Sequence, residues 1–212
     1  MMNKFIKIFN NTYFIIKDAL VYDLDINKIC QGVQKMVPKS IVKNLDVIYI
    51  GNFDDLIDRE MTAAYSDGCI YVLNTHQSES EMIDDIVHEI AHSVEDFFGM
   101  ELYGDVKLEN EFLQKRKMLC HLLKHNNIKF PTNLYSEVDY SENLDKFLYI
   151  DLGYNTLTSY IHDIFPSPYS VTSLREYWAI CFENYHTGKI NIKQMCPEAY
   201  TKITELYKKC GK

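Results

Sequence analysis

The sequence predicts a helix-rich α+β fold built as a single domain of 212 residues. Short runs of β-branched and aromatic residues, typical of strands, are followed by longer stretches in which apolar residues recur at helical spacing. Internal repeats, low-complexity tracts and Pro/Gly/Ser-rich linkers are absent from the sequence. A single domain of this length can bury a sizeable core. We expect residues 1–45 to pack on this domain as N-terminal elements.

Two strands are predicted from local composition. Residues 46–50 (DVIYI) end at Gly51, and residues 69–73 (CIYVL) follow the turn-forming pair Asp67-Gly68. We expect a small sheet, with residues 69–73 as the edge strand that directly precedes the longest helix. Between the two strands, residues 54–60 favour a short helix.

The longest predicted helix covers residues 79–98. Ser78 or Ser80 can cap its first turn, which is acidic, and Gly99 ends it. Its apolar positions follow helical spacing: Met82, Ile83, Ile86, Val87, Ile90, Ala91 and Val94. Further helices are predicted at residues 27–37, 107–124, 142–152, 172–185 and 197–209.

Composition excludes some classes of partner. Acidic residues outnumber basic ones by 30 to 22, so the concentrated positive face that nucleic-acid binding needs is not expected. The sequence contains no apolar run of 18 residues, so we expect no membrane span. Polar residues interrupt the N-terminal apolar stretch, which favours folded structure over a signal peptide. We therefore expect a cytoplasmic protein by default, with incorporation into a virion or export without a signal as alternatives.

The six cysteines are scattered through the chain and lack CxxC spacing. This spacing differs from the dense pattern of small disulfide-stabilised domains. We expect free thiols in a reducing compartment.

The strongest chemical motif is His88-Glu89-Ile90-Ala91-His92, an HExxH sequence inside the longest predicted helix. Residues i and i+4 share one helix face, so both imidazoles can bind one zinc ion. Glu89 lies beside them and can act as a general base. We expect one catalytic zinc ion, held by His88 and His92.

A catalytic zinc site has three protein ligands and one open position, so another residue must complete the set. The metzincin pattern requires a histidine six residues after His92, where this chain has Phe98. That class is excluded. Glu176 and Glu183, which share a face of a later predicted helix at i and i+7, are the candidates from the sequence.

Two segments together resemble a known family. HEIAHSVEDFFG (residues 88–99) and the later pattern PxxYxxxxxxEYWAxxF (residues 166–182) resemble the anthrax lethal factor-like metallopeptidases, including the clostridial Pro-Pro endopeptidases. The resemblance extends over residues 69–206. It implies a zincin-like fold in which Glu176 is the third zinc ligand. It also implies that the hydroxyl of Tyr169, seven residues earlier, stabilises the oxyanion of the reaction.

The chain departs from the family pattern at Ile180, where a second glutamate is usual, and at Arg175, where an acid is frequent. Carboxylates around a metal site orient its ligands, and their loss typically costs about 10–100-fold in metal affinity or activity. Glu183 and Asp85 are the candidates to replace the missing carboxylate.

The sequence therefore predicts a zinc-dependent metalloendopeptidase that hydrolyses a peptide bond with an activated water, with Glu89 as general base and Tyr169 as oxyanion stabiliser. The expected substrate is a protein or peptide bound in extended form along the strand at residues 70–73. One alternative is a weak or inactive metallopeptidase-like structural or interaction module, as in a virus or phage particle. Another is a zinc hydrolase of non-peptide amides. Glu89 and Tyr169 favour chemistry, because a scaffold needs neither.

Overall fold

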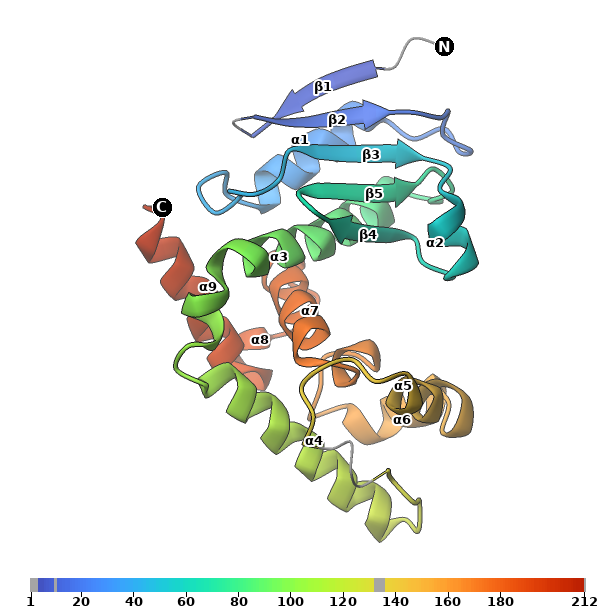
Figure 1. Ribbon diagram of the computed structural model, residues 1–212, viewed down its shortest axis with the longest axis vertical. Coiled ribbons are helices and arrows are strands. Elements are labelled where there is room, and N and C mark those ends of the chain that lie inside the picture. Colours follow the sequence, from blue (N-terminus) through green and yellow to red (C-terminus); the bar gives the residue numbers. More distant parts are fainter. Residues whose placement is uncertain (1–3, 10, 132–135, 212) are drawn as a thin grey trace. The chain divides into compact units, whose positions relative to one another are not determined.

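The computed structural model describes residues 4–9, 11–131 and 136–211. The chain divides into two compact units (Figure 1). The first unit comprises Met1–Gly99 together with Leu206–Lys212, and the second comprises Met100–Glu205. The first unit contains a five-stranded mixed sheet, and helices dominate the second. The predicted α+β class is thus confirmed, while the formation of one domain by the whole chain stays a prediction.

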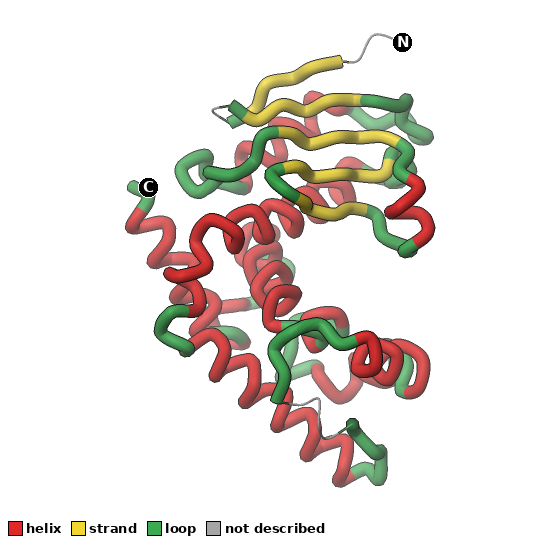
Figure 2. The backbone as a smooth tube through the Cα atoms, viewed as in Figure 1, coloured by secondary structure: helices red, strands yellow, loops and turns green. Residues whose placement is uncertain are grey.

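The sheet of the first unit combines antiparallel and parallel strand pairs; Figure 2 shows its strands in yellow. Its order is β1-β2-β3-β5-β4, with β1 and β4 at the two edges. The pairs β1–β2 and β4–β5 are antiparallel, and β2–β3 and β3–β5 are parallel. The strands are β1 (Lys4–Ile8), β2 (Thr12–Ile16), β3 (Val47–Gly51), β4 (Ala63–Ser66) and β5 (Cys69–Leu73).

The predicted edge position of residues 69–73 is wrong. These residues form β5, which pairs with β3 on one side and with β4 on the other. Asp67 and Gly68 both have positive φ, 47° and 78°, as the tight two-residue hairpin between β4 and β5 requires. This hairpin folds β4 against β5, so the edge strand lies one strand earlier in the chain than predicted.

The core of the first unit lies between one face of the sheet and two helices, α1 (Ile26–Met36) and α3 (Glu79–Tyr103). Alternating residues of β3 and β5 are fully buried, as is one face of α3. Figure 1 shows α1 behind the sheet. α1 and α3 approach closely at Gly32, where an added Cβ would lie 2.5 Å from Ile83 Cδ1. The buried residues of these two strands and of α3 include Ile48, Ile50, Ile70, Val72, Met82, Ile86 and Ile90.

Helix α3 begins where the sequence predicts. The Ser78 hydroxyl accepts a hydrogen bond from the Glu81 amide at 3.2 Å, as an N-cap residue does. Near the predicted end, Phe98 has non-helical angles of φ −108° and ψ 21°. The helix resumes after this interruption and continues to Tyr103, so Gly99 marks a break in α3 rather than its end.

The second unit consists of helices around an aromatic core. Phe112, Phe165 and Tyr177 contact one another with ring centroids 5.5–6.1 Å apart. Within the described part of the chain, none of the helices is long and apolar enough to cross a membrane. The first unit also contains α2 (Asp54–Asp58). The helices of the second unit are α4 (Lys107–His125), α5 (Glu142–Lys146), a π-helical turn (Phe147–Asp151), α6 (Tyr154–Ile161), a 3-10 turn (Tyr169–Val171), α7 (Leu174–Thr187), α8 (Ile192–Met195) and α9 (Pro197–Lys209), whose last residues from Leu206 on belong to the first unit.

Because the packing of α3 on the sheet positions the HExxH residues, its buried face is a direct test of this fold. We expect Ile86→Ala to lower the free energy of unfolding by about 2–5 kcal/mol, since a fully buried side chain is replaced by a cavity. Met100→Ala, on the same helix but 82% exposed, should change it by less than about 0.5 kcal/mol. Urea unfolding followed by circular dichroism measures both. Similar small effects for the two variants would contradict the packing described here.

Candidate metal centre

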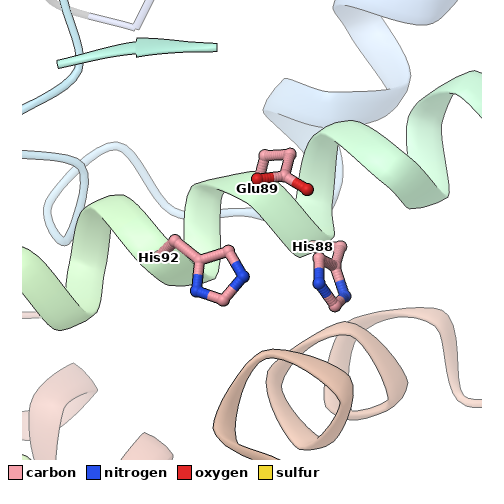
Figure 3. Close-up of side chains that lie close together, drawn as sticks. All are labelled: His88, Glu89 and His92. Carbon is pink, nitrogen blue, oxygen red and sulfur yellow. The ribbon is translucent and has the colours of Figure 1, made fainter. Parts of the chain in front are cut away.

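Helix α3 brings three potential ligands together. The ligand atoms of His88, Glu89 and His92 all lie within 4.8 Å of one another. Figure 3 shows the two imidazoles projecting from the same side of the helix. One helical turn separates them, as the i, i+4 spacing predicts. Two imidazoles and one carboxylate form a donor set suited to zinc.

The three residues of this group are largely shielded from solvent. Glu89 and His92 are 6% and 5% exposed, and His88 is half-buried. The Nδ1 atom of His92 lies 3.4 Å from Glu95 Oε2. A hydrogen on Nδ1 satisfies this carboxylate and leaves the Nε2 lone pair for a metal, which is the usual arrangement at zinc sites. Glu95 therefore orients His92.

A polar cluster fixes α3 one turn before His88. Oδ2 of Asp85 accepts a hydrogen bond from Thr62 Oγ1 at 2.6 Å and lies 2.9 Å from His76 Nε2. Nδ1 of His76 lies 2.8 Å from the Leu73 carbonyl oxygen. Thr62 directly precedes β4, and Leu73 ends β5. Asp85 therefore ties α3 to both strands of the β4–β5 hairpin.

The geometry of this cluster favours a charged His76. A carbonyl oxygen only accepts hydrogen bonds, so Nδ1 carries a hydrogen, and Nε2 faces a carboxylate. Burial by itself lowers the pKa of His76, but the hydrogen bonds to Asp85 and to the Leu73 carbonyl outweigh it, and the pKa is raised. Burial raises the pKa of Asp85, but hydrogen bonds from His76 and Thr62 and the nearby charges of His76 and His88 lower it overall. The two groups thus form an ion pair at moderately acid pH.

His76 was not predicted as part of the site, because it lies outside the HExxH motif. Its position three residues after β5 and nine before Asp85 is the signal that the sequence offers. Asp85 was predicted as one replacement for the carboxylate missing at position 180. In the structure its hydrogen-bond partners are His76 and Thr62, so it supports the helix that carries the ligands.

The other predicted site residues belong to the second unit. The Ser173 hydroxyl caps α7 by accepting a hydrogen bond from the Glu176 amide at 3.1 Å. Glu176 thus stands in the first turn, where the helix dipole favours a carboxylate. Tyr169 begins the 3-10 turn just before α7, and its side chain is 36% exposed.

Helix α7 has two distinct faces. Tyr177, Trp178 and Phe182 are fully buried. Glu176, Ile180 and Glu183 are half-buried and follow one another at i, i+4 and i+7, so they form one stripe. The predicted common face of Glu176 and Glu183 is therefore confirmed. Their joining with His88 and His92 in one site stays a prediction.

Comparison of the chain with protein-family models, with curated proteins and with solved structures gives no match. The resemblance to the lethal factor-like metallopeptidases therefore rests on the two sequence segments that carry it.

The charged pair His76–Asp85 gives the first unit a specific dependence on pH. Because the pKa of His76 is raised, its contribution is complete below about pH 6.5 and is lost as pH rises through the raised value. Because the pKa of Asp85 is lowered, its contribution is complete above about pH 4 and is lost as pH falls through the lowered value. The stabilisation is therefore greatest between about pH 4 and pH 6.5.

We expect His76→Gln to lower the free energy of unfolding by about 1–2 kcal/mol near pH 5.5 and by less near pH 9. This magnitude allows for solvent screening, since the Asp85 side chain is 35% exposed. Urea unfolding with a metal chelator present measures the difference at each pH. His121→Gln, at an exposed position of α4, serves as control and should show no such dependence. An equal loss at both pH values would show that His76 contributes by packing alone.

Proposed function

We propose that this protein is a zinc-dependent metalloendopeptidase. One observation carries the proposal: the ligand atoms of His88, Glu89 and His92 lie within 4.8 Å of one another on α3, with Glu89 and His92 buried. An ordinary solvated surface helix has no need for two imidazoles and a carboxylate in this arrangement. The contact between His92 and Glu95 further supports a metal site, because it fixes the ring orientation that a ligand requires.

Glu176 completes the ligand set in this proposal. Its support comes from the sequence resemblance and from its position at the capped start of α7, where Ser173 fixes its backbone. Glu183 lies on the same stripe, two turns further along. It is the nearest carboxylate on that stripe that can compensate for Ile180.

The chain's own residues supply the proton transfers. Bound zinc would supply Lewis acidity, which polarises a carbonyl oxygen and acidifies water. Glu89 takes a proton from the attacking water while the new C–O bond forms. It then passes this proton to the amine nitrogen as the C–N bond breaks. The burial of Glu89 excludes competing solvent from this transfer.

Tyr169 stabilises the oxyanion that forms during attack. Its hydroxyl is a neutral donor, and its half-exposed ring can meet a substrate. Removing one donor of this kind in other enzymes has cost about a hundredfold or more in rate. The role of Tyr169 rests on its spacing of seven residues from Glu176 and on the resemblance.

The proposed substrate is a protein segment in extended form. Among the described strands, β4 can accept it, because it lies at an edge of the sheet with β5 on its other side. β4 is also tied to the metal helix: Thr62 donates to Asp85, and the Tyr65 hydroxyl donates to Asp96 Oδ2 at 3.1 Å. Pairing with an edge strand uses main-chain hydrogen bonds and holds a peptide largely independently of its sequence.

The central test compares wild type with Glu89→Gln, which keeps the shape of the side chain but cannot accept the proton. We expect both proteins to bind zinc stoichiometrically. Cleavage of a peptide library should fall at least about a hundredfold in the variant, in line with the loss of a general base. Glu81→Gln, at an exposed position about two turns earlier on α3, should retain wild-type cleavage.

The same measurement separates the alternatives. Zinc binding without any peptide cleavage in wild type would favour the structural or interaction module. Turnover of small amides without peptide cleavage would favour a non-peptide amide hydrolase. A failure of wild type to bind zinc would refute the metal site.

The third ligand is tested by a matched pair on the α7 stripe. We expect Glu176→Gln to weaken zinc binding at least about tenfold, because a carboxylate ligand is lost. Glu183→Gln should have a smaller effect. Competition with a chromophoric zinc chelator measures both affinities. A larger effect for Glu183→Gln would assign the ligand to Glu183, and unchanged affinity for both variants would exclude α7 as a source of ligands.

A further inference from the structure

The second unit contains a fully buried cation, Arg116, on α4. Its Nε and Nη2 atoms donate to the Val171 carbonyl oxygen at 2.9 and 2.7 Å, and Nη2 also donates to the Thr172 carbonyl oxygen at 2.7 Å. Nη1 donates to the carbonyl oxygen of Glu137. These hydrogen bonds all reach backbone oxygens that lie 21 to 56 residues away in the chain.

These contacts join two separate segments of backbone. Val171 and Thr172 lie two and three residues after Tyr169, and Glu137 belongs to the segment before α5. The Leu174 amide, at the start of α7, donates to the Val138 carbonyl oxygen at 2.8 Å and so joins the same two segments again. Arg116 therefore holds the turn that precedes α7 against a second segment of the unit.

Arg116 remains charged in this environment. Burial lowers the pKa of its guanidinium to about 10, which still leaves it protonated at neutral pH. The guanidinium carbon lies 4.5 Å from the centroid of the Phe112 ring, a cation–π contact within the aromatic core. A buried charge is tolerated only when its hydrogen-bonding groups are satisfied. The carbonyl oxygens are thus held to the guanidinium, because separating them would leave both sides unsatisfied.

The turn held by Arg116 is buried, whereas Tyr169 at its start is exposed. Ser170, Val171 and Thr172 are fully or almost fully buried, while Tyr169 is 36% exposed. The Thr172 amide and hydroxyl both donate to the Tyr169 carbonyl oxygen, at 3.0 and 2.7 Å. Tyr169 is therefore the exposed first residue of a turn whose backbone is held by hydrogen bonds to Arg116 and within the turn itself.

We propose that Arg116 is a positioning residue that holds the Tyr169 hydroxyl where the reaction needs it, by fixing the backbone of the turn that follows Tyr169. This inference rests on the proposed function for the role of Tyr169. Arginine suits the task because its planar fork reaches several acceptors at once, whereas a lysine ammonium is a single point charge.

A double-mutant cycle tests whether Arg116 acts through Tyr169. We expect Arg116→Lys to lower kcat at least about tenfold, with zinc content unchanged and KM changed less than about twofold. In the Tyr169→Phe background the same substitution should change kcat less than about twofold, because the hydroxyl that Arg116 positions is already absent. An equal loss of kcat in both backgrounds would overturn the proposal.

Lys115→Met is the structural control. Lys115 is also a buried cation on α4 that donates to two carbonyl oxygens, those of Ile164 and Met195, both at 2.7 Å. Its loss should destabilise the fold and change kcat by the same factor with and without the Tyr169 hydroxyl. Fluorescence of Trp178, the single tryptophan and a buried residue of α7, confirms that each variant is folded.

Hydrogen exchange gives a measurement that does not depend on turnover. In Arg116→Lys, the amides of Val171, Thr172 and Leu174, which are hydrogen-bonded within or beside the turn, should exchange at least about tenfold faster than in wild type. Unchanged exchange would overturn the proposal. If wild type shows no zinc-dependent cleavage, the proposed function fails, and the exchange measurement alone decides whether Arg116 fixes the turn.

Discussion

The orientation of α3 about its own axis is the constraint on which the metal centre depends. An α-helix turns about 100° per residue, so a slip of one position would turn the face that carries both imidazoles by about 100° relative to the sheet. Ile86 and Ile90 fix the apolar side of α3 in the core of the first unit. Asp85 fixes the polar side through Thr62 and His76. Apolar burial is non-directional, whereas these hydrogen bonds select one rotation of the helix.

Buried cations perform a comparable task in the second unit. Lys115, Arg116 and Lys202 are all buried, and each donates to backbone carbonyl oxygens. Burying a charge costs desolvation energy, so such contacts are weak evidence for added stability. Their benefit here is geometric, because each side chain binds carbonyl oxygens of a loop or helix far away in the sequence. In this unit, where regular strand pairing does not occur among the described residues, charged side chains take over part of that positioning.

The sequence predicts the local features well and the long-range ones poorly. Clear periodicity or composition marks α3, α4, α7, β3 and β5. The spacing of HExxH also predicts that its two histidines share one helix face. The strands β1, β2 and β4 were missed, although they are about as long as β3 and β5 and Asp67-Gly68 is a recognisable hairpin signal. His76 and Arg116 act through contacts 9 to 56 residues apart, which no local pattern encodes.

The position of Ile180 on α7 indicates which residue the missing glutamate would affect. A glutamate at this position would stand one turn from Glu176 on the half-buried stripe of α7, where two like charges repel. In the proposed site such a carboxylate would act on Glu176, whereas Nδ1 of His92 already lies 3.4 Å from Glu95 Oε2 on α3. The missing carboxylate therefore leaves the orientation of His92 intact. If Glu176 is the third ligand, as we propose, any deficit should fall on Glu176, whose backbone is held by Ser173 but which has no carboxylate at position 180 beside it.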